Sequence, residues 1–327
     1  MSAIRKNRSA ETGTLFDMGK VDANVPDEMR AELPAGAERI LLGTSAFTAK
    51  GWEGTFYPAG MKPAQFLTHY ARRFRTVEVD STFYGTPPLS RVQSWYEKTP
   101  ADFVFAAKVP QVITHDKVLV GCDAEFLEFV KTMEALGEKL GPLLLQFGYF
   151  APNVFKNSSE FLARLVPFLK KLPKEHRFAV EIRNRDWLDE RFADLLRENN
   201  VALALIDQSW MPRPWEMASK FDLVTADFDY VRWLGDRKGI ETVTKSWDKT
   251  VVDRRPDLLQ WVKTFRDLMK RDLKVHAYAN NHYAGNGPGT VKLFWELFEG
   301  KTATRDQQSG TSDQMSPETG SGGQNKV

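Results

Sequence analysis

The stretch Thr76-Val77-Glu78-Val79-Asp80-Ser81-Thr82-Phe83 decides the fold class, because it is a short strand-like run that carries alternating carboxylates. β-Branched and aromatic residues favour a strand, and the period of two places Glu78 and Asp80 on one face. Similar runs occur at residues 39–45, 103–109, 143–147, 178–183, 202–207, 230–234 and 274–280. The chain therefore contains eight predicted strands.

The segments between these runs have apolar residues three or four positions apart, which is typical of amphipathic helices. The clearest examples begin near Phe126, Phe161 and Leu258. Strands buried on both faces and separated by helices predict a parallel sheet. Eight such units within residues 37–300 predict an α/β protein with a (β/α)8 TIM barrel, a fold of about 250 residues. An open doubly wound sheet is the main alternative, but residues 43–47 lack its G-x-G-x-x-G turn.

The two ends of the chain differ in composition from this barrel domain. Residues 1–36 and 301–327 are polar and predict a disordered N-terminal arm and a disordered C-terminal tail. The arm contains one apolar island, Leu15 and Phe16. It is interpreted either as a segment that folds back on the barrel or as a peptide that docks on a protein partner.

Bulk composition excludes several classes of protein. The formal net charge is +2 at pH 7, so overall charge does not support strong binding to nucleic acid or to an anionic membrane. A single cysteine excludes a disulfide framework and a multi-cysteine zinc site, and it fits a reducing compartment. The sequence has neither a long apolar span nor the apolar core of a secretory signal, so we expect a cytoplasmic protein without membrane contact.

Polar side chains end nearly every predicted strand, and barrels of this type bind ligands at the carboxyl ends of their strands. We assign candidate catalytic roles in proton transfer to Glu181, Asp80, Lys108 and His115. The candidate ligand-binding residues are Glu78, Thr82, Tyr84, Gln146, Arg183, Asp207, Tyr230, Arg232, Tyr278, Asn280 and Asn281. The alternative for any one of these residues is an internal ion pair at the top of the barrel core.

Cations within this set indicate an anionic ligand. Lys108, Arg183 and Arg232 supply donors that suit phosphate oxygens. A glycine-rich turn at residues 284–290 opens a predicted helix, and such a turn either presents amide groups to an anion or serves as an ordinary connector. We predict that the barrel mouth binds a phosphorylated ligand: a nucleotide, a nucleic-acid end or a sugar phosphate. No spacing of acidic residues and histidines demands a metal, and the cofactor is unknown.

Two other functions remain open. One is a non-catalytic module that recruits a protein partner through the arm with Leu15 and Phe16. The other is a carbohydrate hydrolase that uses paired carboxylates. If the phosphate prediction holds, a phosphodiester or phosphosugar enzyme is one outcome, but the sequence does not decide whether the protein is an enzyme.

The motifs also resemble those of a known family. They occur in the order found in the YecE-like family, domain of unknown function 72, and the resemblance covers nearly all of residues 41–298. The segments that carry it are Gly43-Thr44-Ser45, residues 77–84, Lys108 with Ile113-Thr114-His115, residues 140–146, residues 179–183, Tyr230-Val231-Arg232 and residues 278–281. The resemblance implies a TIM barrel with a polar site built from these residues, without a settled activity.

A likeness of that family to metal-dependent endonuclease barrels has prompted nucleic-acid suggestions for it. This chain departs from the family pattern at three positions. Asp80 stands where asparagine is usual, and Asn184 and Leu234 stand where histidines are usual. The missing imidazoles weaken a metal-hydrolase interpretation for this chain.

Overall fold

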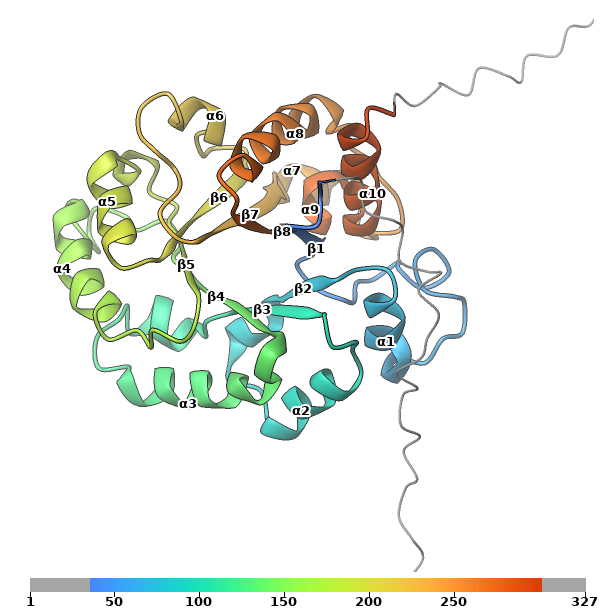
Figure 1. Ribbon diagram of the computed structural model, residues 1–327, viewed down its shortest axis with the longest axis horizontal. Helices are drawn as coiled ribbons and strands as arrows, with labels where there is room; N and C mark the ends of the chain where they lie inside the picture. Colours follow the sequence, from blue (N-terminus) through green and yellow to red (C-terminus); the bar gives the residue numbers. More distant parts are fainter. Residues whose placement is uncertain (1–35, 302–327) are drawn as a thin grey trace, which may run out of the picture.

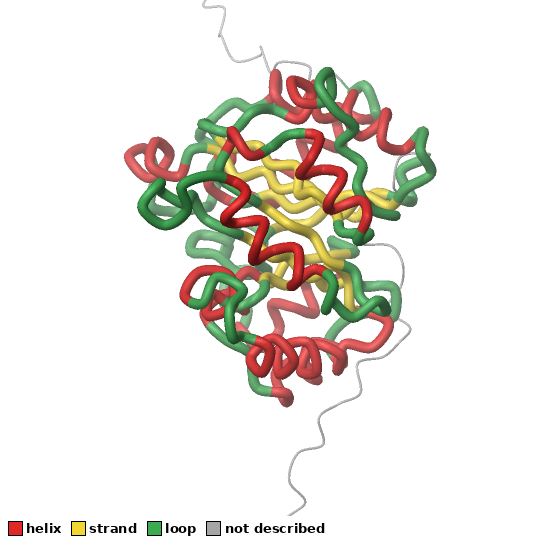
Figure 2. Tube along the Cα trace, turned by 90° about the vertical axis from the view of Figure 1, so that its left-hand side faces the viewer, coloured by secondary structure: helices red, strands yellow, loops and turns green. Residues whose placement is uncertain are grey.

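Eight parallel strands form the centre of the structure, a computed structural model that describes residues 36–301. Their hydrogen-bonded order is β1-β8-β7-β6-β5-β4-β3-β2. The strands are β1 (Ile40–Thr44), β2 (Thr76–Val79), β3 (Val104–Lys108), β4 (Leu140–Gln146), β5 (Phe178–Glu181), β6 (Ala202–Gln208), β7 (Phe228–Gly235) and β8 (Lys274–Ala279). Figure 1 shows the helices outside this ring, and Figure 2 shows the strands enclosed by helices. The predicted (β/α)8 TIM barrel is confirmed.

Helices connect the strands and cover the outer face of the barrel (Figure 1). They are α1 (Phe66–Ala71), α2 (Leu89–Glu97), α3 (Asp123–Met133), α4 (Ser158–Leu169), α5 (Glu190–Glu198), α6 (Pro214–Met217), α7 (Arg237–Val243), α8 (Arg255–Met269), α9 (Asn281–Ala284) and α10 (Gly287–Phe298). The three predicted amphipathic helices correspond to α3, α4 and α8. Each buries its expected apolar residue, respectively Phe126, Phe161 and Leu258.

The ring closes between β1 and β2, where Tyr70 of α1 supplies bridging hydrogen bonds. The Tyr70 hydroxyl accepts from the Thr44 backbone N–H at 2.9 Å and donates to the Thr76 carbonyl at 3.1 Å. A Cβ at Gly43 would lie 2.2 Å from the same Thr76 oxygen, so only glycine allows the two strands to approach this closely. The seam thus depends on one glycine and one tyrosine.

Alternation along the strands separates two apolar layers. Inside the barrel, small residues such as Ala106 and Ala179 pack in one cluster with the large rings of Tyr230 and Tyr278. The intervening residues, such as Leu143, belong to the larger cluster that includes the helices. The mixture of small and large side chains fills the interior as a packed core rather than a channel.

The boundaries of β2 and β4 differ most from the sequence expectation. The run at 76–83 is a strand only to Val79, because Asp80–Tyr84 form a 3₁₀ turn. Strand β4 begins at Leu140 rather than at residue 143, and it includes Gly141. A Cβ at Gly141 would lie 2.5 Å from Val104 Cγ1, so this glycine marks a close approach between strands and not a turn.

The predicted arm and tail lie outside the described residues, apart from their boundary positions 36 and 301. Their predicted disorder and the docking role of Leu15 and Phe16 therefore stay predictions. Among residues 36–301, no helix has the length and apolar character needed to cross a lipid bilayer.

Candidate functional site

Three carboxylates and three cations meet at the carboxyl ends of β2, β3, β5 and β7. We call this group the mouth cluster, and its members are Glu78, Asp80, Lys108, Glu181, Arg183 and Arg232. Asp80 directly follows β2, and Arg183 lies two residues after Glu181, the last residue of β5, so both join the buried glutamates of those strands at the mouth. The structure thus confirms that these side chains, distant in sequence, lie together.

Arg232 is the centre of the mouth cluster. Its Nε and Nη2 donate to Glu78 Oε1 at 3.1 and 2.8 Å, and its Nη1 donates to Glu181 Oε2 at 2.6 Å. Tyr230 donates its hydroxyl to the other oxygen of Glu78 at 2.6 Å. All three guanidinium nitrogens are therefore engaged, and the arginine fixes the two glutamates in place.

The two glutamates on Arg232 have opposite pKa shifts although both are fully buried. Burial alone would raise the pKa of Glu181, but the guanidiniums of Arg183 and Arg232 outweigh it and lower the pKa to about 2. Burial raises the pKa of Glu78 above its ordinary value, although Arg232 opposes the shift. Glu181 is thus held ionised, whereas Glu78 takes up a proton more readily.

Asp80, Lys108 and Arg183 form the accessible rim of the mouth cluster. Their side chains are 37%, 11% and 20% exposed, respectively. Lys108 Nζ lies 3.7 Å from Asp80 Oδ1 and 3.7 Å from the centre of the Phe83 ring. Asp80 Oδ1 is itself buried and has no hydrogen-bond partner among the described residues, but it forms ion pairs with Lys108 Nζ at 3.7 Å and Arg232 Nη2 at 3.5 Å.

His115 lies beside this rim on the segment after β3. Its Nδ1 is 2.8 Å from Thr114 Oγ1, and its ring packs edge-on against Phe83 with centroids 4.9 Å apart. A Cβ at Gly148 would lie 3.5 Å from His115 Nε2, so the ring covers the backbone after β4. Burial and then the charge of Lys108 lower the pKa of His115, which favours the neutral imidazole.

His282, on α9 after β8, is a residue of the mouth that our candidate set lacks. Its Nδ1 lies 2.6 Å from Asn280 Oδ1 and its Nε2 lies 3.1 Å from Glu241 Oε1. Burial lowers the pKa of His282, while the hydrogen bond to Glu241 and the charge of Asp80 oppose the shift. The available signal was its position two residues after Asn280, at the end of a predicted strand.

Comparison with known proteins assigns the family. The model of a protein family described as "Protein of unknown function DUF72" matches residues 41–314, most of the chain. The chain belongs to the DUF72 family. It is 36% identical over 119 residues to the UPF0759 protein YecE of Escherichia coli (strain K12), which covers 36% of this chain and 41% of YecE. It is 29% identical over 150 residues to the UPF0759 protein YunF of Bacillus subtilis (strain 168), covering 43% of this chain and 51% of YunF.

The chain thus aligns with about half or less of the length of these curated relatives. Solved structures of DUF72 proteins show the same fold. The protein TM1631 of Thermotoga maritima matches with a TM-score of 0.59 and 24% identity over 79% of this chain and 98% of that one. The protein EF0366 of Enterococcus faecalis matches with a TM-score of 0.57 and 22% identity over 80% and 95%. These likenesses support the barrel and leave the ligand open.

Asp207 does not join the mouth cluster in this DUF72 protein. It points out of the barrel, where Trp261 Nε1 of α8 and the Tyr283 hydroxyl donate to its Oδ2 at 2.8 and 2.9 Å. Arg213 forms an ion pair with its other oxygen. The residue ties β6 to α8 and α9 and is fully buried, so its position does not suit the predicted ligand contact.

Tyr278 and Asn281 also hold the scaffold together. Tyr278 is fully buried, and its hydroxyl lies 3.0 Å from Thr76 Oγ1 at the start of β2. Asn281 Oδ1 accepts from Trp52 Nε1 at 3.1 Å and from the Gly287 backbone N–H at 2.8 Å. These contacts engage the Tyr278 hydroxyl and the Asn281 Oδ1 in holding the scaffold together.

The remaining predicted residues lie at or near the mouth. Thr82 donates to the Lys108 carbonyl at 2.6 Å and so fixes the turn after β2 to β3. Gln146 is buried beside Glu181 in the β4–β5 register, and Asn280 caps α9 by accepting from the His282 N–H. Tyr84 is 80% exposed and is free to contact a ligand above the cluster.

The glycine-rich turn before α10 has its amide groups occupied. The side chain of Asn286 accepts from the Gly289 N–H, the Asn286 carbonyl accepts from Thr290, and Asn281 accepts from Gly287. The helix begins where the sequence predicts, but its first turn is capped by side chains and does not offer the free donors that an anion needs. Within residues 36–301, no group of three or more His, Cys, Asp or Glu side chains is arranged to hold a metal ion.

Proposed function

We propose that this DUF72 protein binds a phosphorylated ligand at the barrel mouth through Lys108 and Arg183. The observation that carries the proposal is the position of these two cations at the rim of the mouth cluster. Arg232 is bound to both buried glutamates, so Lys108 and Arg183 are the cations of the cluster that a ligand at the mouth can reach. Phosphate oxygens accept hydrogen bonds from both kinds of side chain.

The two rim cations, Arg183 and Lys108, differ in the contacts that they leave open to a ligand. Arg183 uses Nε and Nη2 on Glu181 Oε1, at 2.8 and 2.7 Å, so its Nη1 is left for a ligand. Lys108 lies over the Phe83 ring and forms a long 3.7 Å ion pair with Asp80, so a ligand oxygen can compete for its ammonium group. Arg232, which we expected to share this role, is occupied by the two glutamates and instead holds Arg183 indirectly through Glu181.

If the protein is an enzyme, Asp80 is the carboxylate placed for proton transfer. Its side chain is 37% exposed, although its Oδ1 is buried in ion pairs with Lys108 and Arg232, whereas Glu181 is fully buried with both oxygens engaged. Lys108 and neutral His115 stand beside it as possible donor and acceptor. The same engagement of Glu78 and Glu181 gives no support to glycoside hydrolysis, which needs two carboxyl groups open to the sugar.

Calorimetric titration with inorganic phosphate, adenosine monophosphate and glucose 6-phosphate tests the proposal. We expect at least one of these to bind the wild-type protein, and we expect Lys108→Met and Arg183→Met each to weaken that binding about tenfold or more. The matched control is Arg185→Met, because Arg185 is two residues from Arg183 but is 67% exposed, and its partner Asp186 is 92% exposed. No binding of any probe, or equal binding by all variants, contradicts the proposal.

The recruiting function makes a separate prediction. Its segment, Leu15 and Phe16, lies outside the described residues, so the fold gives it neither support nor contradiction. Substituting both residues with alanine should leave phosphate affinity unchanged, because that affinity depends on the mouth cluster alone. A loss of phosphate binding in this variant would connect the arm to the mouth.

A further inference from the structure

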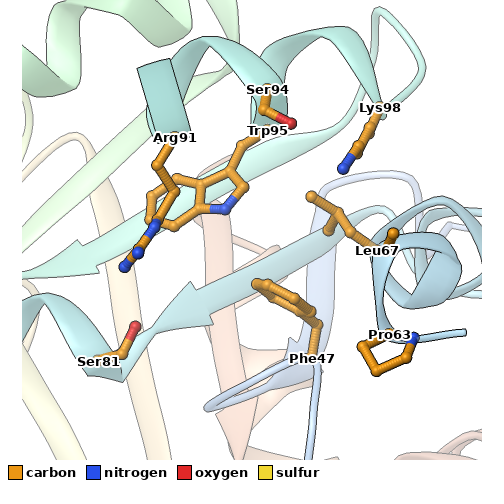
Figure 3. Close-up of a pocket in the computed structure, with 9 residues that line it drawn as sticks. Phe47, Pro63, Leu67, Ser81, Arg91, Ser94, Trp95 and Lys98 are labelled. Carbon is orange, nitrogen blue, oxygen red and sulfur yellow. The ribbon is translucent and has the colours of Figure 1, made fainter. Parts of the chain in front are cut away.

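A second hollow lies outside the barrel core, between α1 and α2 (Figure 3). Its volume is about 340 Å³, within the range of small-molecule sites. The loop after β1 and the turn after β2 complete its walls. The lining residues are Phe47, Pro63, Ala64, Leu67, Ser81, Arg91, Ser94, Trp95 and Lys98.

The charges in this hollow are all positive. Arg91 lies on α2 and Lys98 directly follows the last residue of that helix, and no acidic residue belongs to the lining. Figure 3 shows their side chains at opposite sides of the hollow. Within residues 36–301, neither side chain forms an ion pair, so both cations are available to an anion.

The walls between the two cations are apolar and partly flat. Trp95 and Phe47 approach the hollow from opposite sides, with Leu67 beside them (Figure 3). Trp95 is held from behind by a stacked contact with Phe105, at a centroid distance of 6.1 Å. Aromatic walls that are fixed in this way favour a planar apolar group between them.

Two hydroxyl groups add polar recognition. Ser81 lies in the turn after β2 and Ser94 lies on α2, and both line the hollow. Ser81 follows Asp80 directly in the chain, so the hollow borders the mouth but shares no residue with the mouth cluster. The hollow therefore has its own cations, its own aromatic walls and its own hydroxyl groups.

We propose that this hollow is a second binding site that takes a small planar aromatic anion. The ring lies between Phe47 and Trp95, and the carboxylate or phosphate of the ligand pairs with Arg91 or Lys98. The proposal stands independently of the phosphate site at the mouth, because the two sites use different residues.

Calorimetric titration with four probes on the full chain tests this assignment. Benzoate and phenyl phosphate carry both a ring and a charge, inorganic phosphate carries only the charge, and benzyl alcohol carries only the ring. All titrations use the double variant Lys108→Met and Arg183→Met as the background, so that both rim cations of the mouth are absent. We expect benzoate or phenyl phosphate to bind at least about tenfold more tightly than either single-feature probe.

Substitutions then locate the site. The combined variant with Arg91→Met, Lys98→Met and Phe47→Ala should no longer bind the aromatic anions more tightly than the single-feature probes. At least one of the two single cation variants should weaken binding of the aromatic anions about tenfold. Lys131→Met on the exposed face of α3 is the matched control and should change nothing. Arg91 and Lys98 are surface groups on and just after α2, so their variants should keep the thermal midpoint of the parent protein.

Three results would overturn the assignment. The first is no binding of either aromatic anion, and the second is equal binding of inorganic phosphate and phenyl phosphate. The third is binding that survives the combined Arg91→Met, Lys98→Met and Phe47→Ala substitutions. Benzoate and phenyl phosphate compared directly show whether the hollow prefers a carboxylate or a phosphate.

Discussion

The two ends of this barrel bury titratable side chains with opposite consequences. At the mouth, Glu181 and Arg232 are buried as a hydrogen-bonded pair, and the pKa of Glu181 falls to about 2 because the arginines outweigh burial. At the amino-terminal ends of β7 and β8, Asp229 and His276 are buried without such partners. Burial raises the pKa of Asp229 to about 7 and lowers the pKa of His276 to about 3.

The difference shows that partners, and not depth, decide the charge of a buried group. Asp229 Oδ2 and both ring nitrogens of His276 have no hydrogen-bond partner among the described residues. Arg271 opposes the shift of Asp229, but its nitrogens bind Asp222 at 2.6 and 2.7 Å. One end of the barrel therefore holds charges, and the other end holds neutral forms that titrate with pH.

Removing Arg232, the central cation of the mouth cluster, should have the largest effect on the free energy of unfolding. Arg232→Met leaves Glu78 and Glu181 buried without their shared donor, and breaking a buried pair costs about 3 to 5 kcal/mol of unfolding free energy. Urea denaturation at pH 7 measures the loss. Combining Arg232→Met with Glu78→Gln and Glu181→Gln should restore much of it, because the uncompensated charges are gone. A loss below about 1 kcal/mol in the single variant would contradict the pairing argument.

A neutral side chain at position 229 should remove the cost of burying the Asp229 carboxylate at the amino-terminal ends of the strands. Since the folded pKa of about 7 exceeds the ordinary value of 3.8, the stability that protonation gives is present below pH 4 and is lost as the pH rises through 7. Asp229→Asn should therefore gain up to about 4 kcal/mol at pH 8 and almost nothing at pH 4. Urea denaturation across this range gives the test, and Asp227→Asn, at an exposed position, is the control. A gain in unfolding free energy that is the same at pH 4 and pH 8 would contradict the raised pKa of Asp229.

His276 should show the opposite pH dependence. Its folded pKa of about 3 lies below the ordinary value of 6.5, so the stability of the neutral form is present above pH 6.5 and is lost as the pH falls toward 3. Between pH 6.5 and pH 5, the free energy of unfolding should fall by about 2 kcal/mol less in His276→Gln than in the wild type. Thermal or urea unfolding at both pH values measures this. A pH dependence in the His276→Gln variant equal to that of the wild type would contradict this origin.

The smallest expected effect concerns one hydrogen bond at the mouth. Tyr230→Phe removes the hydroxyl that donates to Glu78 at 2.6 Å, while Arg232 still holds the other oxygen. We expect a loss of about 1 to 2 kcal/mol of unfolding free energy, since the carboxyl loses only one of its donors. Tyr149→Phe, at a position 65% exposed, is the control and should have no measurable effect. An equal loss of unfolding free energy in both variants would show that the hydrogen bond from Tyr230 to Glu78 does not stabilise the fold.

The mouth cluster itself could be predicted well from alternation. Glu78 with Asp80, and Glu181 with Arg183, share a face in sequence, and the barrel brings these faces together. Asp207 could not be placed in this way. Its strand, β6, is buried along its whole length, so apolar residues on both faces give no signal that separates inside from outside.

The pattern of apolar and polar residues by itself determined the eight strands, the helices between them and, on strands such as β2 and β7, the side chains that face the barrel axis, because these depend on local periods of 2.0 and 3.6 residues. Only the tertiary structure decided which of those side chains are free. Arg232 reads as a ligand-binding cation in the sequence, but folding brings two glutamates from β2 and β5 onto it. Hydrogen-bond partners come from distant strands, and no local spacing records them.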